Sequence, residues 1–159
     1  MLFLLFQSGS GRYALDTSRV VEVIPLLQLQ KIPQAPRGVA GVFNYHGRPV
    51  PAVDLSEITQ GGPAEERLGT RIIIVSCTDT SGNEQLLGLI AERAVDVFRR
   101  DAHECLPSGV NVSGAPFLGP VMTDEHGVIQ WIHEQRLLSD QVRDLLYSET
   151  NRLAQNAGD

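Results

Sequence analysis

Two ten-residue stretches of the sequence align without gaps: ALDTSRVVEV at residues 14–23 and GLIAERAVDV at residues 88–97. They share a small residue and leucine, then arginine, valine, an acid and valine at the same positions, 74 residues apart. The apolar segment at residues 2–7 has a counterpart at 71–77. Self-similarity that recurs in one order is typical of a repeated structural unit. We therefore expect two structurally equivalent halves.

Each half also contains a similar turn between apolar segments, NYHG at residues 44–47 and DEHG at residues 124–127. Asparagine or aspartate in first place and glycine in fourth place suit a type I turn, because the short polar side chain caps the backbone and glycine accepts the exit geometry. We predict a type I turn at both positions.

Short β-branched segments bounded by turn residues fill most of the chain, which predicts many strands and few helices. The predicted strands span residues 2–7, 12–15, 19–26, 39–43, 49–53, 71–77, 86–90, 94–99, 117–122 and 128–132. Five strands per half can close into a small barrel with a filled interior. We expect one domain over residues 1–139, with lobes at about 1–60 and 70–139.

Strand alternation also predicts which residues face inward in the repeated stretches. Val21 and Val23 should lie on the inner face, as should Val95 and Val97, because residues two apart share a face. Val20 would then be exposed next to Glu22. Asp96 would be exposed in the same way as Glu22.

The chain changes character in three places. Residues 56–69 are polar and glycine-bearing, which predicts an exposed connection with one helical turn before it, and a second loop is expected at 99–114. After Trp131 the apolar residues fall near helical spacing, and Ser139 or Asp140 can cap a helix that runs to about residue 153. We expect a frayed tail at 155–159.

Composition excludes several classes of function. The chain has 159 residues, 13 Lys+Arg against 19 Asp+Glu and a net charge of −6, so it lacks the excess of cations that phosphate binding requires. Its 2 cysteines form neither a disulfide framework nor a ligand cluster, which favours a reducing compartment. No stretch reaches the length of a membrane span. We expect a cytoplasmic protein that does not bind nucleic acid.

No pattern of catalytic residues emerges from the sequence. Asp101, His103 and Cys105 alternate as ligands on one strand could, but a tight metal site needs three or four convergent ligands. A small metal-dependent or hydrolytic β-barrel enzyme using these residues or the histidines is the alternative reading. A third is a module that binds proline-rich peptides, which needs an aromatic groove. The single tryptophan, Trp131, is predicted in a core strand.

One segment carries a family resemblance: PRGVAGVFNYHGRPVPAVDL at residues 36–55. It resembles the CheW family of bacterial chemosensory coupling proteins, whose characteristic run is Gly-Val-x-Asn-x-Arg-Gly-x-x-x-Pro-x-x-Asp-Leu. The likeness extends over residues 2–139. It implies two intertwined five-stranded SH3-like barrels followed by the helix.

The resemblance also implies a non-catalytic adaptor without cofactor or metal. Such an adaptor binds the regulatory domain of a histidine kinase and the cytoplasmic tip of a methyl-accepting chemoreceptor, in arrays beneath the inner membrane. Carried over by position, the implied receptor-binding residues are Val20, Glu22, Asn44, His46 and Val97, and the implied kinase-binding residues are Val39 and Gly41.

One position departs from the family motif. His46 stands where the motif has arginine, which in the family can face the acid that corresponds to Glu22. Histidine is shorter and mostly neutral near pH 7. We therefore expect a weaker, pH-sensitive contact between Glu22 and His46, and a partner preference that fits a dedicated pathway such as surface sensing.

Overall fold

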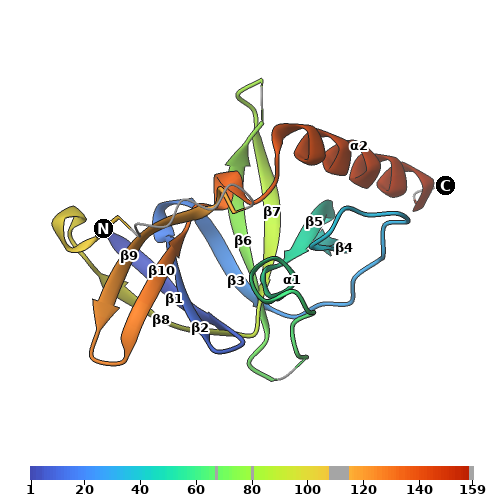
Figure 1. Ribbon diagram of the computed structural model, residues 1–159. Helices are drawn as coiled ribbons and strands as arrows, with labels where there is room; N and C mark the ends of the chain where they lie inside the picture. Colours follow the sequence, from blue (N-terminus) through green and yellow to red (C-terminus); the bar gives the residue numbers. More distant parts are fainter. Residues whose placement is uncertain (67, 80, 108–114, 158–159) are drawn as a thin grey trace.

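The computed structural model describes residues 1–66, 68–79, 81–107 and 115–157 (Figure 1). All ten predicted strands are present, with ends shifted by at most two residues. The strands are β1 (Leu2–Ser8), β2 (Gly11–Asp16), β3 (Val20–Pro25), β4 (Val39–Tyr45), β5 (Arg48–Asp54), β6 (Arg71–Thr78), β7 (Glu84–Ala91), β8 (Arg93–Arg99), β9 (Leu118–Asp124) and β10 (Gly127–Ile132). The helices are α1 (Leu55–Gln60) and α2 (Asp140–Ala157), with short 3-10 turns η1 (Thr17–Arg19), η2 (Ala102–Glu104) and η3 (Glu134–Arg136).

The strands form two five-stranded sheets with the same internal order. One sheet runs β8-β1-β2-β10-β9, and the other runs β3-β6-β7-β5-β4. Position by position, β8, β1, β2, β10 and β9 of the first sheet correspond to β3, β6, β7, β5 and β4 of the second, so equivalent strands always differ by five in number. Each sheet therefore takes two strands from one half of the sequence and three from the other. The predicted halves are equivalent and intertwined, but neither contiguous half is a sheet of its own.

The residue register confirms the alignment of the two repeated stretches. Ala14 of β2 lies opposite Trp131 of the parallel strand β10, and Gly88 of β7 lies opposite Ala52 of the parallel strand β5. Parallel neighbours are rare in a meandering β fold, because they require a longer connection than a hairpin. Ala14 and Gly88 thus occupy equivalent sites, as the sequence alignment predicts.

The main core lies between the two sheets. Its fully buried members come from both, including Phe6 and Leu15 on one side and Ile73, Val75 and Leu89 on the other. Each sheet also encloses a smaller cluster, around Phe43 and Ile72 in one and around Phe3 and Met122 in the other. Within the described residues no ladder joins β3 to β4 or β8 to β9, so the two SH3-like units are open at that edge rather than closed barrels.

The alternation predicted for β3 is wrong, and the strand carries a β-bulge. Val20 pairs with Val75 and Glu22 with Ile74, so Val21 is an extra residue without a partner. A bulge inserts one residue and turns the following side chains to other faces. Val20, opposite Val75, packs against the main core, whereas Val21 and Val23 on this edge strand are exposed by 51% and 39%.

The equivalent strand β8 carries the same bulge. Ala94 pairs with Phe6 and Asp96 with Leu5, which leaves Val95 unpaired. Val97, which alternation placed inside, is 52% exposed. The side chain of Val95 lies outside the described set. The shared bulge is a further mark of the repeat.

Only the first of the two hairpin turns differs from the predicted type I turn, since Glu125 and His126 of the second keep negative φ. In the first, Tyr45 pairs with Arg48, so the loop consists of His46 and Gly47, whose φ angles are 52° and 82°. Positive φ at both loop residues is the type I′ pattern, which matches the twist of hairpin strands. In the second, Asp124 pairs with Gly127, and of the turn residues only Gly127 has positive φ, at 124°. The two turns are therefore not built alike.

The helices extend further than predicted. Asp54 caps α1 through a hydrogen bond that its Oδ1 accepts from Ser56 N at 2.9 Å, and α1 is a six-residue helix. Ser139 Oγ accepts a hydrogen bond from Val142 N at 3.2 Å, as the capping prediction required. α2 continues to Ala157, beyond the predicted end at about residue 153, while 158–159 lie outside the described residues. Of the predicted loop at 99–114, residues 108–114 also lie outside them.

Candidate protein-binding surface

A side-chain hydrogen bond near the predicted site joins β3 to β4. Tyr45 Oη donates a hydrogen bond to Glu22 Oε2 at 2.5 Å. Both side chains lie at the surface, and they come from opposite edge strands of one sheet. The hydrogen bond to the Glu22 carboxylate raises the pKa of the Tyr45 phenol, because ionising the phenol would place two negative charges side by side.

Asn44 and His46, the next two predicted residues, lie at the β4–β5 turn beside this hydrogen bond. Asn44 Oδ1 accepts a hydrogen bond from Gly47 N at 2.7 Å, which fixes the turn. The His46 ring lies edge-on to the Tyr45 ring, with ring centroids 4.4 Å apart. Glu22, Tyr45, His46 and Asn44 therefore form one surface cluster.

The expected contact between Glu22 and His46 is replaced by this arrangement. The Glu22 carboxylate accepts its hydrogen bond from Tyr45, and the His46 ring packs against the Tyr45 ring instead. Sequence reasoning missed Tyr45, which stands at a variable position of the motif. A type I′ loop would have been the signal, since it makes residue 45 the last paired strand residue, next to the turn.

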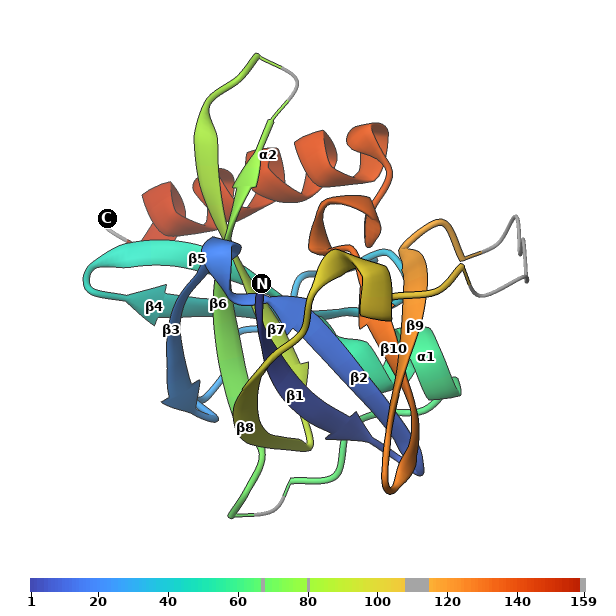
Figure 2. The ribbon, with the colours of Figure 1, turned by 90° about the vertical axis from the view of Figure 1, so that its left-hand side faces the viewer.

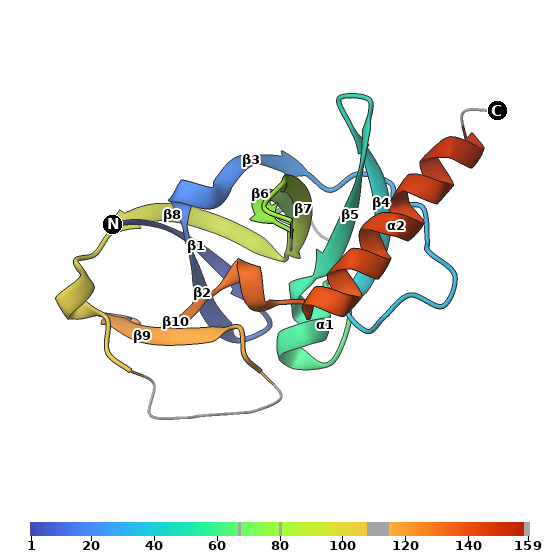
Figure 3. The same ribbon diagram turned by 90° about the horizontal axis from the view of Figure 1, so that it is seen from above.

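The other predicted receptor-binding residues lie on the edge strands. Val20 is half-buried, and its exposed neighbours Val21 and Val23 provide the apolar surface on β3. Val97 provides it on β8. Figures 2 and 3 show β3, β8 and the tip of the β4–β5 hairpin on the same side of the molecule. This side presents exposed valines from both sheets beside the Tyr45 cluster.

The two predicted kinase-binding residues do not offer an exposed side chain. Gly41 is buried, and a Cβ there would lie 2.5 Å from the carbonyl oxygen of Gln30. Its φ of 153° is also one that side-chain-bearing residues rarely adopt. Val39 is half-buried in a cluster with Val42 and Leu146 of α2. The kinase-binding role implied for Gly41 and Val39 stays a prediction, and Gly41 supports it through the segment that contains Gln30 rather than through a side chain.

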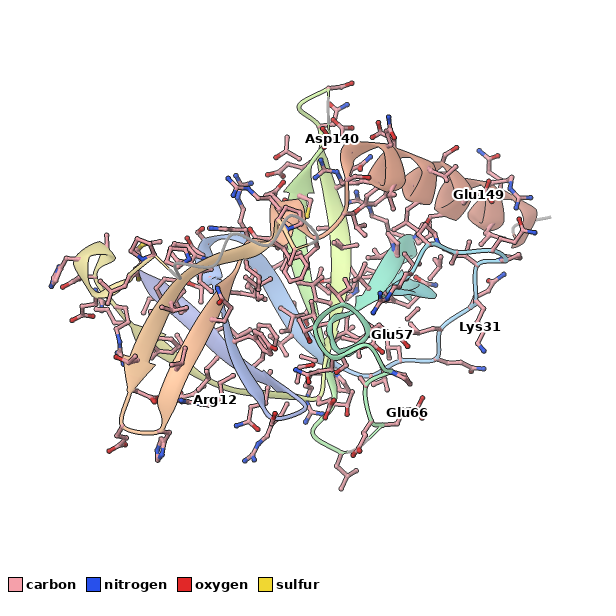
Figure 4. All side chains as sticks on the ribbon, in the orientation of Figure 1. Arg12, Lys31, Glu57, Glu66, Asp140 and Glu149 are labelled. Carbon is pink, nitrogen blue, oxygen red and sulfur yellow. The ribbon has the colours of Figure 1, made fainter. Side chains whose placement is uncertain are left out.

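That segment forms one wall of a groove. The groove has a volume of about 680 Å³ and is lined mainly by apolar residues of the β3–β4 connection, the start of β4, the end of β7 and the loop after α1, including Leu26, Leu27, Leu29, Ala40 and Ile90. Lys31 and Glu66 add charge to its lining, and Figure 4 shows them on the two connections that border it. Gln30 is tied to β4 by two main-chain hydrogen bonds with Val42, both 2.8 Å long. Gly41 therefore determines how closely this wall approaches β4.

The candidate metal ligands are only partly brought together. Asp101, His103 and Glu104 are exposed, and their ligand atoms lie within 4.8 Å of one another, so Glu104 takes the place predicted for Cys105. Glu104 Oε2 already accepts a hydrogen bond from Asp101 N and lies 3.8 Å from Arg100 Nε. Burial raises the pKa of the Cys105 thiol, which is the wrong direction for a thiolate ligand. Asp101 and Glu104 instead cap the η2 turn.

Trp131 is engaged in packing, as predicted. Its half-buried ring meets Phe3 edge-on with centroids 4.9 Å apart and packs against the cluster enclosed by the first sheet. An aromatic groove for proline-rich peptides would need such a ring at the surface. The peptide-binding alternative has no support at this position.

The family model of the CheW-like domain matches residues 2–142. The chain belongs to the CheW-like family. It is 25% identical over 156 residues to the chemotaxis protein CheW of Klebsiella aerogenes, covering 97% of this chain and 86% of that protein. It is 28% identical over 98 residues to the chemotaxis protein CheW of Helicobacter pylori, covering 61% of this chain but only 56% of that protein.

A solved structure matches this CheW-like fold as well. The scaffolding protein TtCheW from Thermoanaerobacter tengcongensis superposes with a TM-score of 0.76 at 26% identity, covering 87% of each chain. The relatives are chemotaxis and scaffolding proteins, and the enzyme alternative finds no support among them. Among the described residues of this CheW-like chain, no helix has the length and apolar character to span a membrane.

Proposed function

We propose that this CheW-like protein is a non-catalytic adaptor that couples the cytoplasmic tips of chemoreceptors to the regulatory domain of a chemosensory histidine kinase. The observation that carries the proposal is the side of the molecule where Val21, Val23 and Val97 are exposed beside the Tyr45 cluster. Exposed apolar residues on edge strands with a polar rim are typical of reversible protein contacts. We assign this side to the receptor.

The kinase contact is proposed for the groove beside Gly41. Its lining is mainly apolar, which suits the anchor side chain of a partner domain. Gly41 would act by positioning the wall rather than by touching the kinase, because the Gln30 carbonyl oxygen occupies the space that a side chain at position 41 would need. Val39 would act in the same indirect way through α2.

The signalling pathway is proposed from the presence of His46 where the family motif has arginine. An imidazole on the Tyr45 ring offers a different recognition surface from a guanidinium, which is always charged and presents a planar fork. We therefore assign the protein to a dedicated pathway, such as surface sensing, with the arrays in the cytoplasm beneath the inner membrane.

Calorimetric titration with the two purified partners tests the adaptor role. Val21→Asp should weaken binding of the receptor-tip helical hairpin by about tenfold or more and leave kinase binding unchanged. Gly41→Asp should do the reverse. Leu145→Asp serves as the control, because Leu145 is similarly exposed (57%) on α2. If neither the kinase regulatory domain nor a receptor tip of the same organism binds the unmodified protein, the adaptor proposal fails.

A further inference from the structure

A cluster of hydrogen-bonded side chains joins the two sheets beside α1. Ser8 ends β1 of the first sheet, and Ser56 and Thr59 lie in α1, which follows β5 of the second. Ser8 and Ser56 are 0% and 1% exposed, and their Oγ atoms lie 2.7 Å apart. Thr59 Oγ1 lies 3.2 Å from Ser8 Oγ. We call these three residues, together with Glu92 between β7 and β8, the hydroxyl joint.

Counting protons gives the direction of each hydrogen bond in the hydroxyl joint. Ser56 Oγ donates to Glu92 Oε1 at 2.9 Å, and Thr59 Oγ1 donates to a main-chain carbonyl of α1 at 2.7 Å. A hydroxyl has one proton, so Ser8 is the donor in its contacts with Ser56 and Thr59. Glu92 Oε1 also accepts a hydrogen bond from Gly9 N in the β1–β2 turn, at 3.3 Å. The joint therefore ties β1 and its turn to α1 through a single arrangement of donors and acceptors.

The repeat places a second joint between the sheets. Gln135 lies in η3, which follows β10 of the first sheet, and its side chain reaches β6 of the second. Its Nε2 donates to Ser76 O at 3.2 Å, and its Oε1 accepts from Thr78 N at 3.3 Å. Gln135 is the second residue of η3, as Ser56 is of α1. We call Gln135 and its two main-chain partners the amide joint.

The strand register shows that the two joints are equivalent. Ser8 pairs with Gly11, and Cys77 pairs with Gln85. Gly11 and Gln85 are 74 residues apart, the same separation as the aligned stretches of the repeat. Cys77, between the two residues that Gln135 binds, therefore corresponds to Ser8. Figures 1 and 3 show α1 and η3, the orange-red turn before α2, between the two sheets.

These joints differ in kind from the main core between the sheets. Apolar contacts have no preferred direction, so the core selects one orientation of the sheets only weakly. Hydrogen bonds have preferred distances and angles, and breaking a buried one leaves a polar group without a partner. A rotation of one sheet against the other would break bonds in both joints at once. The joints therefore restrict the sheets to one orientation.

We propose that the two joints position the exposed valines for the receptor by fixing how the sheets are oriented. Val21 and Val23 lie on β3 of the second sheet and Val97 on β8 of the first, so their spacing depends on that orientation. Ser56 and Gln135 are positioning residues, which act on the receptor surface without being part of it. The inference rests on the receptor contact proposed above and adds the residues that shape it.

Residual dipolar couplings of the full chain, measured by NMR, test the orientation without any partner. The amide couplings of both sheets should fit one alignment tensor in the unmodified protein. The double variant Ser56→Ala/Gln135→Ala should need a separate tensor for each sheet, because both joints lose their side-chain hydrogen bonds. Glu92→Gln should still fit one tensor, because an amide oxygen also accepts the bond from Ser56. Gln155→Ala, at an exposed position on α2, is the matched control.

Calorimetric titration of the same variants tests the effect on binding. If the double variant holds the receptor-competent orientation about one-fifth of the time, its affinity for the receptor tip falls about fivefold. Its affinity for the kinase regulatory domain should not change, because every residue lining the kinase groove belongs to the second sheet or its connections. Glu92→Gln and Gln155→Ala should leave both affinities unchanged.

Three results would overturn the proposal. The two sheets of the double variant still share one tensor, or separate tensors are accompanied by an unchanged receptor affinity. The third is an equal loss of receptor and kinase affinity, which indicates general destabilisation. If the double variant does not fold, the two single variants replace it in both measurements. A receptor tip that does not bind the unmodified protein refutes the function proposed above, and the couplings still decide whether the joints fix the orientation.

Discussion

Tyr45 donates a hydrogen bond to Glu22 across the open side of its sheet, joining the two edge strands β4 and β3, which no ladder connects. An edge strand leaves main-chain groups without partners, and natural sheets protect such edges with charges, bulges and covering segments. Here the bulge at Val21 and the carboxylate of Glu22 stand on the same strand. The Tyr45 contact thus completes a protected edge while leaving Val21 and Val23 exposed.

Glu22→Gln should lower the pKa of Tyr45, because the pKa is raised chiefly by the hydrogen bond to the carboxylate. A phenol whose folded pKa is raised contributes stability below its unfolded pKa of about 10 and loses it as the pH rises through the folded value. An NMR titration of the tyrosine ring signals measures the change. Glu125→Gln, in the other hairpin turn, is the control. An unchanged Tyr45 titration in Glu22→Gln would contradict the contact.

Gly41→Ala should destabilise the fold by about 1–3 kcal/mol, the usual cost of forcing extra atoms into a packed site. The new Cβ would lie 2.5 Å from the Gln30 carbonyl oxygen, and backbone cannot move aside as a flexible side chain can. Urea denaturation measures the difference. Gly62→Ala is the matched control, since nothing lies within 4 Å of its Cβ position. Equal midpoints for the two variants would refute the close approach.

Gly88→Ala should also be costly, although the equivalent residue of the repeat is Ala14. At Gly88 a Cβ would lie 2.6 Å from the Phe43 ring and 2.9 Å from Ile72. The cost is again about 1–3 kcal/mol by urea denaturation. Gly88→Ala combined with Phe43→Leu should be less destabilised than the sum of the single changes, because the smaller side chain leaves room. Strict additivity would argue against the Phe43 contact as the cause.

Glu134 should make the free energy of unfolding decrease as the pH rises. Burial raises its pKa, and nearby Asp16 raises it further, while a backbone hydrogen bond and Arg19 act in the opposite direction. A carboxyl with a raised folded pKa favours folding below its unfolded pKa and loses this contribution as the pH rises through the folded one. Glu134→Gln should therefore be more stable relative to the unmodified protein at about pH 8 than at about pH 4.

Chemical denaturation at both pH values measures this difference. Gln135→Glu is not a suitable control, because Gln135 itself bonds the main chain of Ser76 and Thr78. Glu125→Gln, at an exposed turn, should show no such pH trend. The interpretation is wrong if the Glu134→Gln difference is the same at both pH values.

The sequence predicts the strands well because their signal is local. Apolar segments between turn residues appear at all ten strands, and the match between Ala14 and Gly88 is reproduced in the register. The exposure of Val21, Val23 and Val97 is not predictable from alternation, because β3 and β8 are edge strands, which stay partly open to solvent, and each carries an unpaired residue that breaks the register.

The candidate site is predicted less completely for a related reason. Glu22, Asn44 and His46 do come together, but through Tyr45, and a contact between β3 and β4 depends on how a sheet curves rather than on spacing along the chain. Gly41 illustrates a different limit. The motif marks it as important, yet only the position of Gln30 shows that its importance is the absence of a side chain.

The exchange of strands between the two sheets limits how this chain can be divided. β1 and β2 pair with β8 and β10, and β5 pairs with β7, so a cut in the loop after α1 would leave each fragment with strands whose neighbours are on the other fragment. Neither fragment could fold to its native sheets alone, but the two should reassemble when mixed. Neither five-stranded unit can therefore exist without the other. Because the chain passes back and forth between the two sheets, a strain applied to one sheet is transmitted to the other through covalent bonds.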